Sequence, residues 1–395
     1  MSLNTDPLIY PFDRAPGPGQ AVQIAPGVLW LAMPLPMALG HINVWALADG
    51  DGWTLVDTGM HTPDTAAAWQ HAFSHSLGDR PVRRVICTHM HPDHVGTAGW
   101  LTRQFSCALW MTRLEYVFCR MLVADTHREA PEEATRFYRA AGWDEAAIAD
   151  YRARFGGFGK FIYTLPESFR CVRDEEEIDI GIHRWNALIG RGHSPEHLCL
   201  YCPELKVLIS GDQVLPRISS NVSVFPTEPE ADPLGDWLSS IDHIARHVPG
   251  DLLVLPAHNE PFRGLHVRLA RLKERHEEAL ERLLQALREP KRVIDLFALL
   301  FRRPVHKELL ILATGETLAH LNYLMHRGLV ARDLRDGVAW YTAIEQPVPA
   351  RAPERSDPAL QPRLSAPDLS SRLSRSSVTP LPTSASRRVA RIPGP

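Results

Sequence analysis

Residues 88–96, THMHPDHVG, place four side chains of metal-binding types within six positions, directly after the strand-like stretch 84–87. The run therefore begins where a strand is expected to end. A tight loop there can aim His89 and His91 at one cation, and Asp93 and His94 at a neighbouring cation. The run predicts a metal site on a loop that a rigid sheet holds in place.

Three more candidate ligands occur in similar settings further along the chain. His193, Asp212 and His258 each come shortly after a strand-like run, and these runs are 184–189, 206–209 and 252–255. Ligands at the ends of several strands can converge, although they are far apart in the sequence. Together with the first run they make seven side chains, which is enough for two metal sites that each keep an open position.

These residues resemble the metallo-β-lactamase superfamily. The family's H-x-H-x-D-H pattern is matched without a gap from His89 to His94, and the turn DTG at 57–59 precedes it. The remaining candidate ligands follow in the family's order, each after a strand-like run, so that the resemblance spans residues 27–262. It implies an α/β fold of four layers, αββα, and a metal-dependent hydrolase.

The resemblance also implies how the ligands are shared between two metals. A first metal is held by His89, His91 and His193, a second by Asp93, His94 and His258, and Asp212 bridges them. Zinc fits the three-histidine site, whereas the carboxylate at the second site also suits manganese or iron. We therefore expect two divalent metal ions, with zinc as the leading choice.

Catalytic and supporting roles follow from the same resemblance. A water shared by two cations has its pKa lowered towards roughly 7, which makes a bridging hydroxide the nucleophile at neutral pH. Asp93 would orient the hydroxide and carry its proton, while Asp212 would hold the two cations together. Asp57 is expected to accept hydrogen bonds that fix the ligand loop without binding metal, and His197 to hold the His193 loop.

Three side chains are candidates for holding the substrate. Arg217 lies in the polar stretch after Asp212, where a guanidinium could clamp a carboxylate or a phosphate. A surface ion pair is an equal alternative for Arg217. Asn221 and Asn259 are weaker candidates of the same kind.

Composition and periodicity divide the chain into parts. An N-terminal extension (1–26) precedes the hydrolase domain (27–262), and a helical insertion (115–167) interrupts that domain. The glycine-rich end of the insertion, 155–161, suits either a lid over the site or an ordinary helical hairpin. The tail 346–395 is rich in Pro, Ser and Arg and is predicted to be disordered.

The part between them, 263–345, is predicted to be a helical domain. A long amphipathic helix runs from Leu265 to Leu287, and three helical runs (293–301, 307–313 and 316–327) and a hairpin turning at 336–337 follow it. The pattern resembles the winged-helix-like domain of a subgroup of these hydrolases and of a small endoribonuclease branch. Packing against the hydrolase domain, or a homodimer, is favoured over nucleic-acid binding, because acids interrupt the basic residues near the hairpin.

Charge and composition limit the partners. The chain has 395 residues and a formal net charge of −3, and because the tail 346–395 carries +5, the rest carries −8. An acidic body disfavours general nucleic-acid binding. No stretch predicts a membrane span or a signal peptide, and the six cysteines are scattered like free thiols. A cytoplasmic protein with a small-molecule substrate and no membrane partner is expected.

Three functions fit these features. The preferred one is hydrolysis of a small acyl compound such as a thioester, a lactone or an ester. The first alternative is an endoribonuclease or phosphodiesterase, which would use the same hydroxide and the winged-helix-like domain to hold the strand. The second alternative is a binding or regulatory protein that keeps the fold without the chemistry, and the intact set of seven ligands argues against it.

Overall fold

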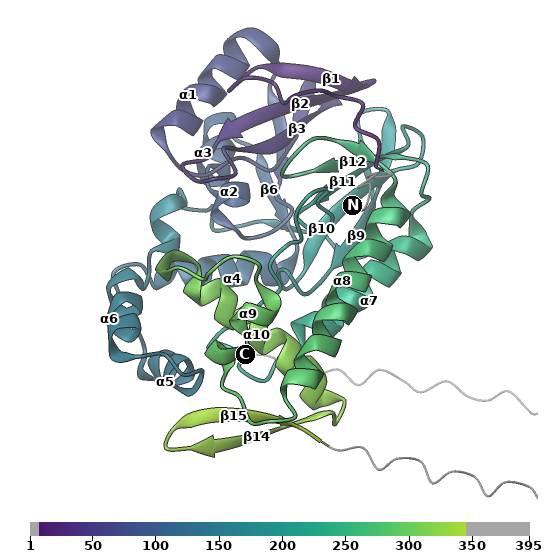
Figure 1. Cartoon of the computed structure of the whole chain (residues 1–395). Helices are drawn as coiled ribbons and strands as arrows, with labels where there is room; N and C mark the ends of the chain where they lie inside the picture. The colour runs from purple at the N-terminus through teal and green to yellow at the C-terminus, as the bar shows by residue number, and fades with distance from the viewer. Residues whose placement is uncertain (1–7, 345–395) are drawn as a thin grey trace, which may run out of the picture. The chain divides into compact units, whose positions relative to one another are not determined.

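Two β-sheets packed face to face form the centre of the computed structural model, which describes residues 8–344 (Figure 1). The first sheet consists, in spatial order, of β1 (Ala21–Ala25), β2 (Val28–Pro34), β3 (His41–Asp49), β4 (Gly52–Val56), β5 (Val82–Ile86), β6 (Ala108–Met111) and β7 (Arg170–Cys171). The second consists of β13 (Phe262–Arg263), β12 (Leu253–Pro256), β11 (Val207–Gly211), β10 (His197–Cys202), β9 (His183–Gly190) and β8 (Glu177–Ile180). Both sheets mix parallel and antiparallel pairs.

The central strands explain the apolar runs of the sequence. β4 is buried along its whole length, between antiparallel β3 and parallel β5. A strand that is covered on both faces needs apolar residues at successive positions, not only at alternate ones. Each strand-like run predicted before a candidate ligand is a strand, namely β5, β9, β11 and β12.

Three apolar clusters define the layers. The cluster between the sheets contains large side chains of both, among them Trp30, Trp45 and Trp185. The second cluster joins the outer face of the first sheet to helices, and the third does the same for the second sheet. The order of layers is therefore helices, sheet, sheet, helices. The helices on the first sheet are α1 (Pro63–His71), η1 (Ala72–Ser76), α3 (Ala98–Phe105) and α4 (Arg113–Ala124).

The second sheet is covered by α7 (Pro233–His247) and α8 (Leu265–Ala286). α8 confirms the predicted amphipathic helix, because Leu265, Leu269, Leu272 and Leu283 are buried and the charged residues lie between them. One charged side chain breaks this pattern. Arg268 is 2% exposed, and its guanidinium reaches the backbone of the segment that follows β11.

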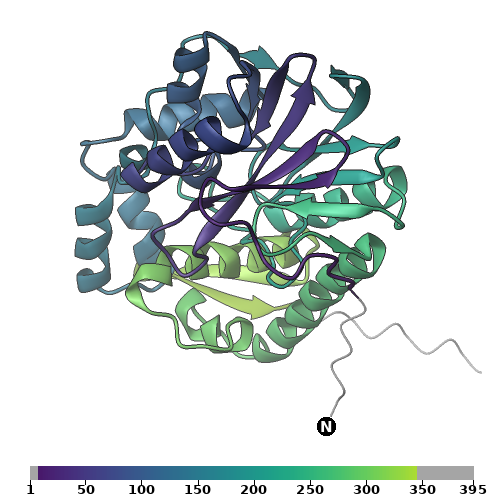
Figure 2. The same cartoon turned by 90° about the horizontal axis from the view of Figure 1, so that it is seen from above.

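The chain after α8 forms a small C-terminal domain that shares the third apolar cluster. It contains η3 (Val293–Leu296), α9 (Phe297–Leu300), η4 (Lys307–Leu309), α10 (Leu310–His326) and the hairpin β14 (Val330–Arg335) with β15 (Val338–Ala343). The hairpin turns at 336–337 as predicted. Figure 2 shows these elements, green to yellow, together on one side of the sheets.

The two helical runs predicted at 307–313 and 316–327 are wrong as separate helices, because α10 is continuous from Leu310 to His326. Gly315 lies inside this helix, where it serves packing. A Cβ at Gly315 would lie 2.7 Å from the side chain of Ser223 and 2.8 Å from the carbonyl oxygen of Val224. The missing side chain therefore lets another segment approach the helix closely.

The predicted insertion, which lies in the sequence between His94 and His193, contains helices as expected. It begins within α4 and continues with α5 (Glu132–Ala140), α6 (Glu145–Arg154) and η2 (Phe158–Phe161). The indole Nε1 of Trp143 donates to Thr314 Oγ1 of α10, so the insertion packs on the C-terminal domain. The glycine-rich end packs closely against the end of α4, and the amide of Tyr163 donates to the Gly96 carbonyl.

The N-terminal stretch of the described chain is ordered on both sheets. β1 lies in the stretch predicted as an N-terminal extension and pairs with β2, while Ile9 bridges to Arg263. The tail predicted from residue 346 lies outside the described residues. All six cysteines lie within the described residues and are free thiols. None of the described helices combines the length and the apolar character that crossing a membrane requires.

Candidate metal centre

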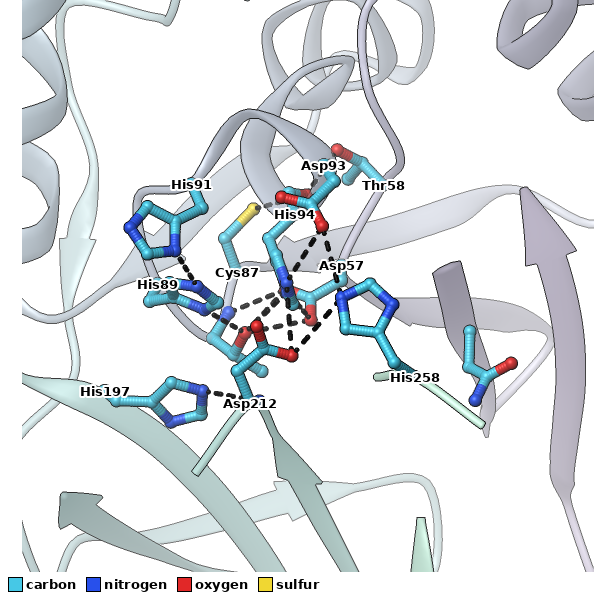
Figure 3. Close-up of polar contacts among 12 residues, drawn as sticks. Asp57, Thr58, Cys87, His89, His91, Asp93, His94, His197, Asp212 and His258 are labelled. Atoms are coloured by element: carbon cyan, nitrogen blue, oxygen red, sulfur yellow. Dashed lines mark hydrogen bonds and ion pairs between the residues drawn. The ribbon is translucent and has the colours of Figure 1, made fainter. Parts of the chain in front are cut away.

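The candidate ligands stand on loops at the ends of strands from both sheets. The loop after β5 carries His89 and His91 and continues into the short helix α2 (Pro92–Val95), which holds Asp93 and His94. His193, Asp212 and His258 follow β9, β11 and β12 of the second sheet. The structure therefore brings all seven predicted ligands into two neighbouring groups, His89, His91, His193 and Asp212, and Asp93, His94 and His258. Figure 3 labels these residues except His193.

The first group presents ring nitrogens to a common point. His89 Nε2 lies 2.8 Å from His91 Nδ1 and 3.3 Å from His193 Nε2. These distances match atoms that share one cation, because three ligands about 2.0–2.1 Å from a zinc ion lie roughly 3–3.5 Å apart. Asp212 Oδ2 completes the group at 3.4 Å from His193 Nε2.

The second group faces the other oxygen of the same carboxylate. Asp212 Oδ1 lies 3.6 Å from His94 Nε2 and 3.5 Å from His258 Nε2. Asp93 Oδ2 lies 3.3 Å from His258 Nε2 and 3.7 Å from His94 Nε2. One oxygen of Asp212 thus points at each group, which is the geometry of a bridging ligand (Figure 3).

Two buried atoms show that these residues fit cations. Within residues 8–344, His94 Nε2 and Asp212 Oδ1 are buried without a hydrogen-bond partner. A buried polar atom without a partner costs free energy of about 1–3 kcal/mol, so its persistence calls for an explanation such as an ion. The nitrogen and carboxylate donors, set in two groups, are those that zinc, manganese and iron accept.

The electrostatics of the two groups differ. Burial alone would lower the pKa of His94, but the three carboxylates around it outweigh burial and hold this pKa well above its usual value. Burial would raise the pKa of Asp212, but His258 and His94 outweigh it and hold this pKa well below normal. In the first group, burial lowers the pKa of His91 to about 3, with His193 adding to the effect. Ionised carboxylates and a neutral His91 are the states in which these side chains bind metals, whereas a protonated His94 releases its extra proton when a metal binds.

Asp57 lies where the resemblance predicted, beneath the ligand loop. Its Oδ1 accepts from the Thr88 amide at 2.8 Å, and its Oδ2 lies 2.8 Å from His94 Nδ1. A carboxylate can only accept here, so His94 Nδ1 carries the proton and Nε2 is left to face the metal. Asp57 holds this place with a left-handed backbone, at φ 61°.

His197 supports a different segment from the one expected. We predicted that it holds the His193 loop, but its Nε2 accepts from the amide of Asp212 at 3.0 Å. The contact fixes the backbone of Asp212 at the end of β11. Gly211 makes the contact possible, because a Cβ there would lie 2.6 Å from the His197 ring.

Glu115 is a buried carboxylate that the sequence analysis did not identify as part of the site. From α4, its Oε1 accepts from Ser194 Oγ at 2.6 Å and from the Glu196 amide at 2.7 Å, and its Oε2 accepts from the Met90 amide at 2.9 Å. Burial raises the pKa of Glu115, and these three donors oppose the rise. Glu115 therefore ties together the two loops that carry the first group.

Backbone carbonyls orient two further histidines. His193 Nδ1 lies 2.8 Å from the Asn221 carbonyl oxygen, and His258 Nδ1 lies 3.3 Å from that of His41. The loop of His258 is itself fixed by Asn43, whose Nδ2 donates to two carbonyls of that loop at 2.7 and 2.8 Å. Sequence reasoning missed Asn43, since an Asn within a strand carries no signal of such a role.

The predicted substrate residues make contacts within the protein. Arg217 pairs with Glu260 at 3.0 Å and stacks on Tyr10, as the surface ion-pair alternative predicted. The Asn221 side chain bonds to Glu316. Asn259 has φ 67°, and among the described residues its Oδ1 is buried without a hydrogen-bond partner. No substrate role follows from these contacts.

A sandwich of two sheets with two groups of His and Asp ligands at one edge defines a metallo-hydrolase. The family model of the metallo-beta-lactamase superfamily matches residues 37–288, and that of the metallo-beta-lactamase-like C-terminal domain matches residues 280–344. The chain belongs to the metallo-β-lactamase superfamily.

Several relatives extend over most of the chain. A probable metallo-hydrolase of Bacillus subtilis, YqjP, is 25% identical over 310 residues, covering 75% of this chain and 92% of that protein. The crystal structure of a beta-lactamase domain protein from Burkholderia ambifaria has a TM-score of 0.78 and 38% identity, over 85% of this chain and 98% of that one. A metallo-beta-lactamase family protein from Thermus thermophilus has a TM-score of 0.69 and 28% identity, over 82% and 100%.

Proposed function

We propose that the protein hydrolyses a small acyl substrate, such as a thioester, a lactone or an ester, at a dinuclear zinc site. The observation that carries the proposal is the position of Asp212, whose two oxygens face the two ligand groups. When bound, two such ions supply a hydroxide nucleophile at neutral pH and polarise the substrate oxygen under attack. The three-histidine first group favours zinc, and the second also accepts manganese or iron.

Asp93 is placed to handle the proton of the reaction. Its carboxylate lies within 3.7 Å of His94 and 3.3 Å of His258. Burial would raise its pKa, but His94 and His258 together outweigh burial and bring the pKa to about 2, so the group is ionised at neutral pH. An ionised carboxylate can orient an attacking water, take up its proton and return it to the leaving group.

The charges near the hairpin favour a small substrate over RNA. Arg327 pairs with Asp232 at 3.1 Å, Arg332 with Glu230 at 2.9 Å and Arg335 with Asp333 at 3.0 Å. Binding of RNA is driven by cations that are available to phosphates, and these three are already paired with acids. The body of the chain, without the tail 346–395, also carries −8.

Metal analysis of the purified protein, followed by a panel of thioesters, lactones, phosphodiesters and short RNAs, tests the proposal. We expect about two zinc ions per chain and turnover of an acyl substrate that His89→Ala abolishes. The control is His75→Ala, which removes an exposed histidine on η1. One metal or fewer after full loading would contradict the dinuclear site.

Salt dependence separates the two substrate classes. RNA affinity falls steeply with salt, whereas turnover of a small acyl substrate should change little. The RNA measurements are made with and without residues 346–395, whose charge of +5 can bind RNA non-specifically. Submicromolar, salt-sensitive binding without the tail, with RNA cleavage lost in His89→Ala, would make the endoribonuclease the better proposal.

A further inference from the structure

The segment from Ser220 to Val224, which follows the bridging Asp212, is docked on α10 of the C-terminal domain. The Val224 amide donates to the Gly315 carbonyl at 3.0 Å, and Ser223 Oγ lies 3.3 Å from the Leu312 carbonyl oxygen. The close approach of Ser223 to Gly315 fills the space of a missing side chain. The C-terminal domain therefore holds a segment of the candidate metal centre.

A chain of two hydrogen bonds connects α10 to a candidate metal ligand. Glu316 Oε2 accepts from Asn221 Nδ2 at 2.8 Å. The carbonyl oxygen of the same Asn221 lies 2.8 Å from His193 Nδ1. A carbonyl only accepts, so His193 carries its proton on Nδ1 and presents Nε2 to His89 and Asp212.

The Asn221 side chain decides where its carbonyl points. Besides the bond to Glu316, its Oδ1 accepts from Ser223 Oγ at 2.5 Å. The two bonds fix the amide plane on both sides, and the backbone of a loop residue that is held in this way has little freedom to rotate. Without the bond to Glu316, the Asn221 side chain would lose its hydrogen bond to the side chains of α10.

We propose that Glu316 is a positioning residue of the first metal group: by holding Asn221, it orients His193, so that the C-terminal domain completes the metal centre. The inference rests on the proposed function, because it requires that His193 binds a metal. It assigns a role to the C-terminal domain that needs no nucleic acid. It also gives Asn221 a role in the protein's own structure in place of the predicted contact with substrate.

Stepwise removal of zinc by a competing chelator, measured on the full chain, tests the proposal. His91→Ala and His258→Ala identify which step belongs to which group. Loss of an outer partner of a metal ligand lowers metal affinity by about 10–100-fold. We expect Glu316→Ala and Asn221→Ala each to weaken the first group by about tenfold or more and to leave the second within about threefold.

Conservative and double variants separate positioning from general damage. Glu316→Gln keeps an acceptor oxygen for Asn221 and should retain zinc within about threefold of the wild type, whereas Glu308→Gln removes an exposed acid of η4 and serves as the matched control. The Glu316→Ala and Asn221→Ala effects should not add in the double variant, because both break the same bond. If Glu316→Ala does not fold, Asn221→Ala with Asn221→Asp, which lacks the donor, carries the same test.

The outcomes distinguish this inference from the proposed function. A wild-type protein that binds one metal or fewer would overturn the proposed function and the inference with it. A wild type with two metals, in which Glu316→Ala or Asn221→Ala matches Glu308→Gln, would overturn the inference alone. Additive effects of the two alanine variants, or equal weakening of both metal groups, would do the same.

Discussion

Two segments supply most of the candidate metal centre, and they are supported in opposite ways. The segment 88–94 carries four ligands and is held from below by Asp57 of the same sheet. The segment 212–224 carries one ligand and is held by residues of α8 and α10, which come much later in the chain. The ligands are therefore concentrated in the sequence, while their support is spread across it.

Asp212→Ala tests the residue of the segment 212–224 that lies beside ligands of the segment 88–94. Asp212 faces both ligand groups, so its loss should remove the second metal and reduce turnover by more than about 100-fold, the upper range for loss of an outer partner. The fold should persist, because the backbone amide of residue 212 can still donate to His197 Nε2 when the side chain is replaced. Metal content, kinetics and circular dichroism measure these effects, and wild-type turnover would disprove the bridging role.

Arg268→Met tests the support of the segment 212–224. Arg268 Nη2 donates to the Ile218 carbonyl at 2.7 Å, and its Nε donates to the Leu215 carbonyl at 2.5 Å. Methionine leaves the buried Leu215 carbonyl without its donor and also removes the bond to the Ile218 carbonyl, so the free energy of unfolding should fall by about 1–3 kcal/mol. Urea denaturation measures the loss, with the exposed Arg275→Met as control. Equal stability of both variants would show that α8 does not hold the segment.

Asp57→Asn tests the support of the segment 88–94. Asparagine can still accept from Thr88, but it cannot provide a second acceptor oxygen for His94 Nδ1. We expect the second metal to bind about 10–100-fold more weakly while the first changes less. Chelator titration provides the measurement, and Asp51→Asn, in an exposed ion pair, is the control. If only the first metal were bound more weakly, Asp57 would not be the residue that supports His94 and the second group.

His276→Asn tests the contact between α8 and α10. His276 Nδ1 lies 3.2 Å from His320 Nε2, and burial lowers the pKa of His276 to about 3. Below about pH 6.5 the unfolded chain binds a proton that the folded chain does not, so this pair lowers stability as the pH falls. Between pH 7.5 and pH 5, wild type should lose on the order of 1–2 kcal/mol more than the variant. Parallel losses in urea denaturation would contradict this assignment.

The parts of the site that the sequence predicted are those with short-range signals. Asp93 and His94 follow His89 and His91 in one run, and that run needs only the strand before it to become a loop. Asp57 could be added because the resemblance to the family covers the turn at 57–59, which also follows a strand of the same sheet. The same locality explains why the strands before the ligands were predicted correctly.

The remaining supports were beyond prediction because they depend on tertiary contacts. Glu115 stands in the first turn of an amphipathic helix, where an acid is favourable for helix formation alone. Arg268 lies among the charges of α8 and is distinguished only by burial. The continuity of α10 through Gly315 was also missed, because glycine is locally unfavourable inside a helix and only its packing against Ser223 accounts for its place there.

The contact between Gly315 and Ser223 has a consequence for how this protein and its relatives diverge. A side chain at position 315 requires the backbone at 223–224 to retreat, and position 223 can accept a larger residue only under the same condition. The two positions are therefore expected to covary during evolution, although 92 residues separate them. For the same reason, a chimera that takes its last domain from another lineage should regain activity when the segment 220–224 is transferred with it.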